Sequence, residues 1–153
     1  MNTHVPMSPE LLIIVGLPGS GKTIFLKSLL KEGRIADYCD DYEYGPIKDV
    51  APALSPEDKR LLAGLERGEK WAIADTRYCD SNERIKVVKE FKKKFPELSI
   101  KFMYFENNPD LCVQNATIRE GILPRHQINL IYYYTSMYHI PRNAKVMEVY
   151  SGR

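Results

Sequence analysis

GLPGSGKT, at residues 16–23, matches the pattern G-x-x-x-x-G-K-[ST] without a mismatch. An apolar run typical of a buried strand, Leu11 to Val15, comes directly before it. The residues after it, 24–30, carry apolar side chains at helical spacing. Strand, glycine-rich loop and helix are the context in which this pattern forms a phosphate-binding loop, or P-loop. A chance glycine turn before a helix is the alternative, and the flanking strand and helix disfavour it.

Each part of this loop has an expected task. Glycines let the backbone wrap closely and point its N–H groups at phosphate oxygens, and the N-terminus of the helix adds a favourable dipole. Lys22 is expected to reach the β- and γ-phosphates, and the Thr23 hydroxyl to hold Mg²⁺. The cofactors expected are therefore ATP and Mg²⁺, and the sequence leaves open the choice between ATP and other nucleoside triphosphates. The residues expected to bind the nucleotide are Gly16, Pro18, Gly19, Ser20, Gly21, Lys22 and Thr23.

Length and composition indicate an ordinary soluble domain. The 153 residues fit one domain, with a polar arm expected at residues 1–9 and a single domain at residues 10–153. The formal net charge of +2 is too small to indicate nucleic-acid binding by itself. The composition leaves the oligomeric state open.

Cysteine usage and hydropathy indicate a cytoplasmic protein. The three cysteines show no C-x-x-C spacing, so we expect reduced thiols and not a disulfide framework. The three histidines are scattered, which gives no indication of a zinc site. The N-terminus lacks a signal pattern, and the longest apolar runs are far too short to span a membrane. We therefore expect no membrane partner.

Strand-like and helix-like segments alternate along the chain. This alternation predicts an α/β fold with a mainly parallel five-stranded sheet flanked by helices, and a helical lid. The strands are predicted at residues 11–15, 34–38, 71–74, 99–105 and 145–150. Helices are predicted at residues 22–31, from 55 to about 68, at 81–95, from 108 to a break at 121–124, and at 127–139.

Acidic residues follow two of the predicted strands. Asp40 and Asp41 come after the second strand, and Asp75 follows the third in the manner of a Walker-B acid. Ligands of open parallel sheets bind beyond the carboxyl ends of the strands. A carboxylate beside ATP can help hold Mg²⁺ or accept a proton from an attacking hydroxyl. The alternative for each acid is a turn or helix-cap aspartate.

Two arginines are candidates for neutralising charge during phosphoryl transfer. Arg119 lies in the helix that begins near residue 108, and Arg125 lies just beyond the break at 121–124. A mobile segment that carries arginine commonly supplies this charge. For both residues the alternative is a solvated surface arginine.

Four segments together resemble a known family: residues 16–23; Asp40-Asp41-Tyr42; Ala74-Asp75-Thr76 with Asn82-Glu83-Arg84; and the stretch from 113 to 141. The chain resembles the kinase domain of phage polynucleotide kinases, within the small P-loop kinases that include zeta-type toxins. This resemblance implies transfer of the γ-phosphoryl of ATP to a hydroxyl, in that family the 5′-hydroxyl of a nucleic acid. It implies Asp40 as general base, Asp75 and Thr76 beside the acceptor, and a lid at residues 114–124.

The chain departs from this family at two places. Glu43 stands where the family has an arginine that grips the acceptor's phosphate, and Gln114 and Ile118 stand where the lid has arginines. Arg119 is one residue along, which is about 100° of helix rotation. The expected catalytic residues are Lys22, Asp40 and Arg119, and the expected acceptor residues are Asp41, Glu43, Asp75 and Thr76. The alternatives are a nucleoside or sugar kinase, and a nucleotide-binding module that hydrolyses ATP without an acceptor.

Overall fold

The computed structural model describes residues 8–42, 55–121 and 124–151. Within them the strands form one sheet in the order β2-β3-β1-β4-β5, and all neighbouring strands are parallel. The strands are β1 (Glu10–Val15), β2 (Asp37–Cys39), β3 (Lys70–Ala74), β4 (Ser99–Phe105) and β5 (Val146–Met147). The predicted five-stranded parallel α/β fold is confirmed.

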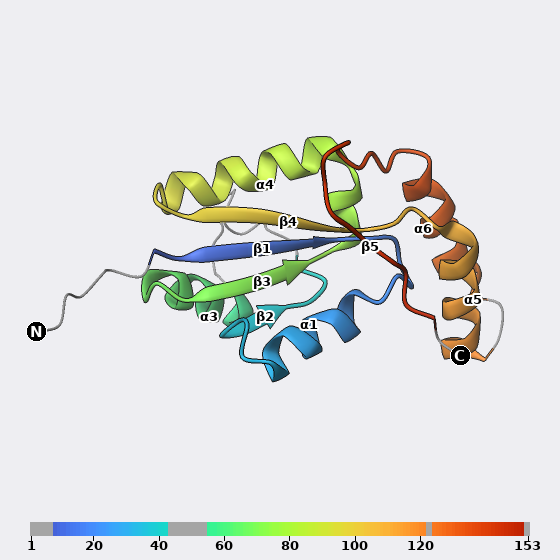
Figure 1. The fold of residues 1–153 in the computed structure, drawn as a ribbon, viewed down its shortest axis with the longest axis horizontal. Coiled ribbons are helices and arrows are strands. Elements are labelled where there is room, and N and C mark those ends of the chain that lie inside the picture. Colours follow the sequence, from blue (N-terminus) through green and yellow to red (C-terminus); the bar gives the residue numbers. More distant parts are fainter. Residues whose placement is uncertain (1–7, 43–54, 122–123, 152–153) are drawn as a thin grey trace, which may run out of the picture.

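Helices cover the sheet and its carboxyl end. Figure 1 shows α5 and α6 stacked beyond the ends to which the strand arrows point, while α1 and α4 lie along the sheet. The helices are α1 (Lys22–Lys31), α3 (Pro56–Glu66), α4 (Ser81–Lys94), α5 (Pro109–Glu120) and α6 (Arg125–Thr135), and η1 (Thr76–Cys79) is a 3₁₀ turn. No helix in the described ranges is long and apolar enough to span a membrane.

The central strand β1 is buried on both of its faces. Leu11, Ile13 and Val15 point into a core shared with α3, α4, α5 and α6. Leu12 and Ile14 point to the opposite face, where α1 packs. Since helices cover both faces of a parallel sheet, its inner strands read as continuous apolar runs, and this explains the sequence before the P-loop.

Local sequence sets where α3 and α5 begin. Ser55 Oγ accepts from the Asp58 backbone N–H at 3.0 Å, and Asp58 Oδ2 accepts from the Ser55 N–H at 3.1 Å, which completes a capping box. Asn108 Oδ1 accepts from the Leu111 N–H at 3.1 Å. Both helix starts are at the residues that the sequence predicts.

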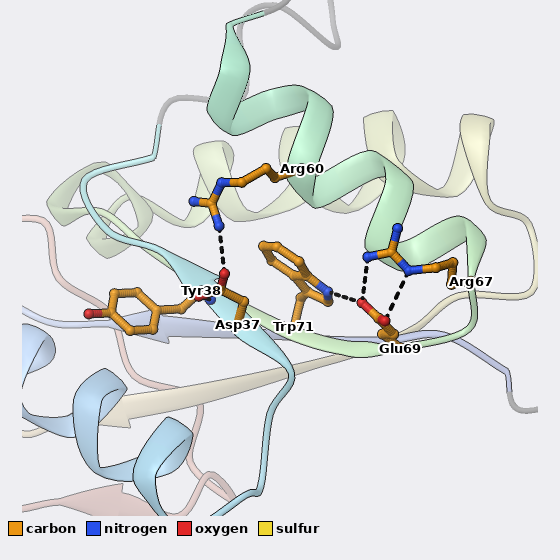
Figure 2. A network of polar contacts seen from close by, with 6 residues as sticks. All are labelled: Asp37, Tyr38, Arg60, Arg67, Glu69 and Trp71. Atoms are coloured by element: carbon orange, nitrogen blue, oxygen red, sulfur yellow. Dashed lines mark hydrogen bonds and ion pairs between the residues drawn. The ribbon is translucent and has the colours of Figure 1, made fainter.

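Polar contacts fasten α3 to the sheet edge formed by β2 and β3, as Figure 2 shows. Arg60 donates to Asp37 at 2.5 Å, and Arg67 makes two hydrogen bonds with Glu69, at 3.0 and 3.1 Å. Trp71 Nε1 donates to Glu69 at 2.9 Å, which satisfies the only polar atom of a buried ring. The exposed ion pairs add little stability, so the buried apolar contacts carry most of the attachment.

Three predicted boundaries were wrong. The strand predicted at 34–38 is β2, which spans Asp37–Cys39, the residues that pair with β3. Ala36 makes one hydrogen bond to the Lys70 carbonyl just before this strand begins. The helix predicted at 127–139 is α6, which begins after Pro124 and ends earlier than predicted. The strand predicted at 145–150 is β5, which spans only Val146–Met147. After it the chain leaves the sheet, and the Val149 N–H donates to the Glu106 carboxylate at 2.9 Å.

Candidate functional site

A cavity of about 760 Å³ opens between the P-loop, the ends of β2 and β3, and helices α5 and α6. It lies beyond the carboxyl ends of the strands, as the sheet topology predicts. The structure brings ten predicted site residues to this cavity: Pro18, Gly19, Gly21, Lys22, Thr23, Asp40, Asp41, Asp75, Thr76 and Arg119. Glu43 and most of the predicted arm at residues 1–9 lie outside the described residues.

The P-loop wraps one wall of the cavity. Gly19 and Gly21 have φ angles of 82° and 108°, in the left-handed region that glycine adopts easily. Pro18 and Thr23 also line this wall, whereas Gly16 and Ser20 are buried behind it. The tight turn therefore depends on its glycines.

Lys22 lies folded against the loop that precedes it. Its Nζ donates to the carbonyls of Gly16 at 2.8 Å and Leu17 at 2.9 Å, and the residue is 8% exposed. Burial lowers the pKa of Lys22, while nearby acidic groups, including Asp40 and Asp41, oppose that shift. Phosphate oxygens in the cavity could exchange with these two carbonyls as partners of the ammonium group.

Thr23 and Asp40 lie side by side. The Thr23 hydroxyl donates to Asp40 Oδ2 at 2.5 Å, and the Asp41 N–H donates to Asp40 Oδ1 at 3.0 Å. Mg²⁺ prefers oxygen ligands, and commonly takes one or two from protein, the others being water and phosphate. In the described part of the chain no group of three or more acidic, cysteine or histidine side chains could hold a metal. The Thr23 hydroxyl and the Asp40 carboxylate therefore suit a Mg²⁺ ion that is bound mainly by a nucleotide. They are too few to enclose the ion with protein ligands alone.

Tyr42 anchors the segment that carries the two acids. Its N–H binds the Ala74 carbonyl at 2.8 Å, and its hydroxyl donates to Asp58 Oδ1 at 2.5 Å. Its own carbonyl accepts from the Tyr78 hydroxyl at 3.1 Å. Burial, and then the Asp58 carboxylate, raise the pKa of Tyr42, so the phenol remains a donor through the neutral range. These contacts tie the end of β2 to β3, α3 and η1.

We expect Tyr42→Phe to lower the free energy of unfolding by about 1–3 kcal/mol, because a buried Asp58 oxygen loses its hydrogen bond. Urea denaturation measures this. The control is Tyr132→Phe, since Tyr132 is 52% exposed, and its change should stay within about 0.5 kcal/mol. Equal effects of the two substitutions would contradict the anchoring role of Tyr42.

Asp75 lies at the end of β3 and also caps η1. Its Oδ1 accepts from the Arg77 backbone N–H at 3.0 Å, and its Oδ2 lies 3.6 Å from Arg77 Nε. Burial raises the pKa of Asp75, and the contacts with Arg77 oppose this rise. The two readings of this residue from the sequence, a cap and a site carboxylate, both fit its position.

Asp75→Asn is expected to leave stability at pH 7 unchanged or higher. The raised pKa means that the folded chain binds this proton more tightly than the unfolded chain, so stability is lost as pH rises through the folded pKa. Asparagine has no charge to desolvate and keeps the capping oxygen. The advantage should shrink toward pH 4, near the unfolded pKa of about 3.9. Urea midpoints at both pH values test this. A lower midpoint for the variant at pH 7 would mean that the ion pair with Arg77 outweighs burial.

The two candidate arginines differ in position. Arg119, on α5, lines the cavity, and its neighbour Ile118 lines it too. Arg125 is exposed at the first residue of α6 and does not line the cavity, and neither does the exposed Gln114. The offset of one residue therefore leaves Arg119 at the site.

Sequence reasoning missed a clamp on the P-loop. Asn115 Nδ2, on α5, donates to the Gly19 carbonyl at 2.9 Å and to the Tyr150 carbonyl at 2.5 Å. The Tyr150 N–H in turn donates to the Ser20 carbonyl at 2.9 Å. The partners of Asn115 are 96 and 35 residues away, so no local pattern indicates these contacts. Arg77, Gln127 and Tyr134 also line the cavity without having been predicted.

Comparison with known proteins identifies a relative. "Uncharacterized protein R277" of Acanthamoeba polyphaga mimivirus is 31% identical over 121 residues, covering 76% of this chain and 80% of the viral protein. The chain belongs to the same family as this mimivirus protein. No family model matches the sequence.

Comparison with solved structures finds proteins of similar fold. A gluconokinase from Sinorhizobium meliloti 1021 superposes with a TM-score of 0.57 at 14% identity, covering 94% of this chain and 83% of the gluconokinase. An uncharacterized protein from Eubacterium ventriosum ATCC 27560 reaches 0.48 at 15% identity, covering 93% and 89% of the two chains. At such identity the likeness to the gluconokinase shows a shared fold alone.

Proposed function

We propose that this protein is an ATP-dependent phosphotransferase that moves the γ-phosphoryl group of ATP to a hydroxyl. The observation that carries the proposal is one cavity with a P-loop on one wall and carboxylates at the ends of β2 and β3 on another. A donor and an acceptor bound there would meet between Lys22 and Asp40. The kinase domain would span residues 10–153.

Apolar side chains around the P-loop offer a surface for the nucleotide base. Ile24, Ile118 and Tyr150 line the cavity and are 49%, 55% and 46% exposed. Exposed apolar groups gathered in a cavity commonly mark a ligand site. A planar base can pack on such groups, and the aromatic ring adds stacking. This surface supports a nucleotide as the donor.

The charged residues would divide the work of the transfer. Lys22 would bind the donor phosphates, and Arg119 would neutralise charge that develops on the transferring oxygens. The Thr23 hydroxyl would hold Mg²⁺. When bound, Mg²⁺ supplies charge neutralisation on the phosphates.

On the acceptor side, Asp40 would act as general base. The acceptor oxygen forms a bond to the γ-phosphorus, the bond from that phosphorus to the ADP oxygen breaks, and the hydroxyl proton passes to the Asp40 carboxylate. Asp41, Asp75 and Thr76 would bind the acceptor. Glu43, which follows the same segment in sequence, would add to this group.

The 5′-hydroxyl of a polynucleotide is the first candidate acceptor, because of the resemblance of the four segments to phage polynucleotide kinases. A nucleoside or sugar is the second. The replacement of the phosphate-gripping arginine by Glu43 favours an acceptor with neutral hydroxyls or a cationic group at that position. The alternative to any acceptor is a nucleotide-binding module, which would hydrolyse ATP without transferring the phosphoryl group.

Label transfer from γ-labelled ATP tests the proposal. The purified protein is mixed with Mg²⁺ and, in separate reactions, a 5′-hydroxyl oligonucleotide, a nucleoside and a sugar. We expect label on the oligonucleotide and none on a control oligonucleotide that already carries a 5′-phosphate. Label only on the nucleoside or sugar would make the protein a small-molecule kinase. ATP hydrolysis without any transfer would favour the nucleotide-binding module.

A further inference from the structure

Part of the cavity lining comes from η1 and α6, two elements outside the P-loop. From η1 it has Thr76 and Arg77, and from α6 it has Gln127, Leu130 and Tyr134. The three residues of α6 are spaced by three and four, so they share one face of the helix. We call this set of five residues, together with Asp75, the acceptor wall.

Opposite charges are balanced around the cavity. Among the described residues that line it, the carboxylates are Asp40, Asp41 and Asp75, and the cations are Lys22, Arg77 and Arg119. Lys22 belongs to the P-loop and Arg119 to α5, where the nucleotide is proposed to bind. Arg77 is therefore the cation of the acceptor wall.

Arg77 is built into this wall. Its Nε lies 3.6 Å from Asp75 Oδ2, and its side chain is 30% exposed. That separation is longer than the 2.7–2.9 Å typical of a charge-assisted hydrogen bond. A guanidinium carries five N–H donors in a planar fork, so it can hold Asp75 and a ligand oxygen at the same time.

The rest of the acceptor wall suits a hydroxyl-rich molecule. Thr76 has a hydroxyl, Gln127 an amide and Tyr134 a phenol, and each can hydrogen-bond a polyol. Helix α6 contacts η1, and Tyr134 lines the same cavity as Asp75 and Arg77. Burial and Asp75 raise the pKa of Tyr134, and Arg77 opposes this rise. A ligand bound between η1 and α6 would meet both the neutral donors and the guanidinium.

We propose that Arg77 binds an anionic group, a carboxylate or a phosphate, on the acceptor molecule. The acceptor is thus an acidic hydroxyl compound, and its reacting hydroxyl lies on the side of Asp40. This inference rests on the proposed phosphotransferase function and deepens it. A nucleotide that carries a 3′-phosphate and a sugar acid share this chemistry.

The other possible role of Arg77 is only to hold Asp75. Loss of the guanidinium would then impair every acceptor equally, whatever its charge. Recognition of an anion predicts a loss confined to acidic acceptors. The ratio between an acidic compound and its neutral counterpart separates the two roles.

The experiment uses two matched pairs of acceptors: adenosine 3′-monophosphate with adenosine, and an aldonic acid with the alditol of equal chain length. For each compound, kcat/KM is measured with γ-labelled ATP and Mg²⁺. Binding is measured by calorimetry on protein saturated with a non-hydrolysable ATP analogue and Mg²⁺. The variants are Arg77→Gln and Arg77→Lys, and the matched control is Arg142→Gln, which removes an exposed arginine outside the cavity.

We expect at least one acidic compound to be preferred over its neutral partner by about ten- to hundredfold, the range of hydrogen bonds to charged groups. Arg77→Gln should abolish that preference by weakening the acidic compound alone. Arg77→Lys should keep part of it, and Arg142→Gln all of it. The pair that shows the preference identifies the source of the anion.

Three results would overturn the assignment: neither acidic compound binds, each acidic compound equals its neutral partner, or Arg77→Gln leaves the preference intact. Failure of the proposed function is a separate result. An acidic compound that binds through Arg77 while no acceptor receives label would keep the anion site and reject the transferase.

Discussion

Replacement of Lys22 by methionine is expected to lower the rate of phosphoryl transfer by about a hundred- to thousandfold, the usual effect of deleting one group that stabilises developing charge. Methionine has a similar length and no charge. The side chain is almost fully buried against the P-loop carbonyls of Gly16 and Leu17, so an apolar replacement fits the position. The fold should therefore persist while the site loses its cation. Label transfer gives the rate, and calorimetry gives the dissociation constant for ATP, which should rise.

Lys27→Met provides the matched control for this variant. Lys27 is an exposed residue of the same helix, α1, and does not line the cavity. Its replacement should leave both the rate and the ATP affinity within about twofold, as expected for a surface change. A Lys22→Met protein as active as this control would show that the P-loop is not the phosphate site.

For Asp40→Asn we expect loss of transfer with ATP affinity retained. A general base contributes about 10²- to 10⁴-fold to the rate. The asparagine oxygen can still accept from the Thr23 hydroxyl, so the local geometry is kept. Single-turnover transfer and ATP binding, each measured across a range of Mg²⁺ concentrations, separate the roles. The control is Asp110→Asn, an exposed acid in the first turn of α5.

The Mg²⁺ titration decides between the two tasks of Asp40. A rate that stays low at every Mg²⁺ concentration supports proton transfer to this carboxylate. A rate restored by high Mg²⁺ would assign Asp40 to the metal and leave the base to be found among Asp41 and Asp75. Unchanged activity at ordinary Mg²⁺ would remove Asp40 from the mechanism.

What could be predicted from the sequence was local. The apolar run of β1, the glycines of the P-loop and the helix start at Ser55 are each decided by neighbouring residues, and the structure has them where expected. Asp40 and Asp75 could be expected to lie beside one cavity, because the carboxyl ends of parallel strands share one edge of the sheet. The parallel pairing follows from the same alternation of segments, whereas the strand order was not predicted.

The residues that were missed depend on turns and on distant contacts. Arg77 lines the cavity because η1 follows Asp75, and a 3₁₀ turn of four residues has no strong signal in sequence. Tyr150 reaches the P-loop because the chain leaves β5 after Met147. The sequence pattern instead predicted that the strand continues to residue 150. Whether Arg119 or its neighbour faces the cavity depends on the rotation of α5, which periodicity alone does not fix.

The clamp on the P-loop has a consequence for biosynthesis. The loop is made early, yet its carbonyls at Gly19 and Ser20 receive their partners from Asn115 and from Tyr150. Domains form as units during translation, and contacts between distant residues wait for both partners. A nascent chain arrested before residue 150 leaves the ribosome should therefore not yet capture nucleotide, even with β1 and α1 fully emerged. Nucleotide binding would then report that residue 150 has left the ribosome.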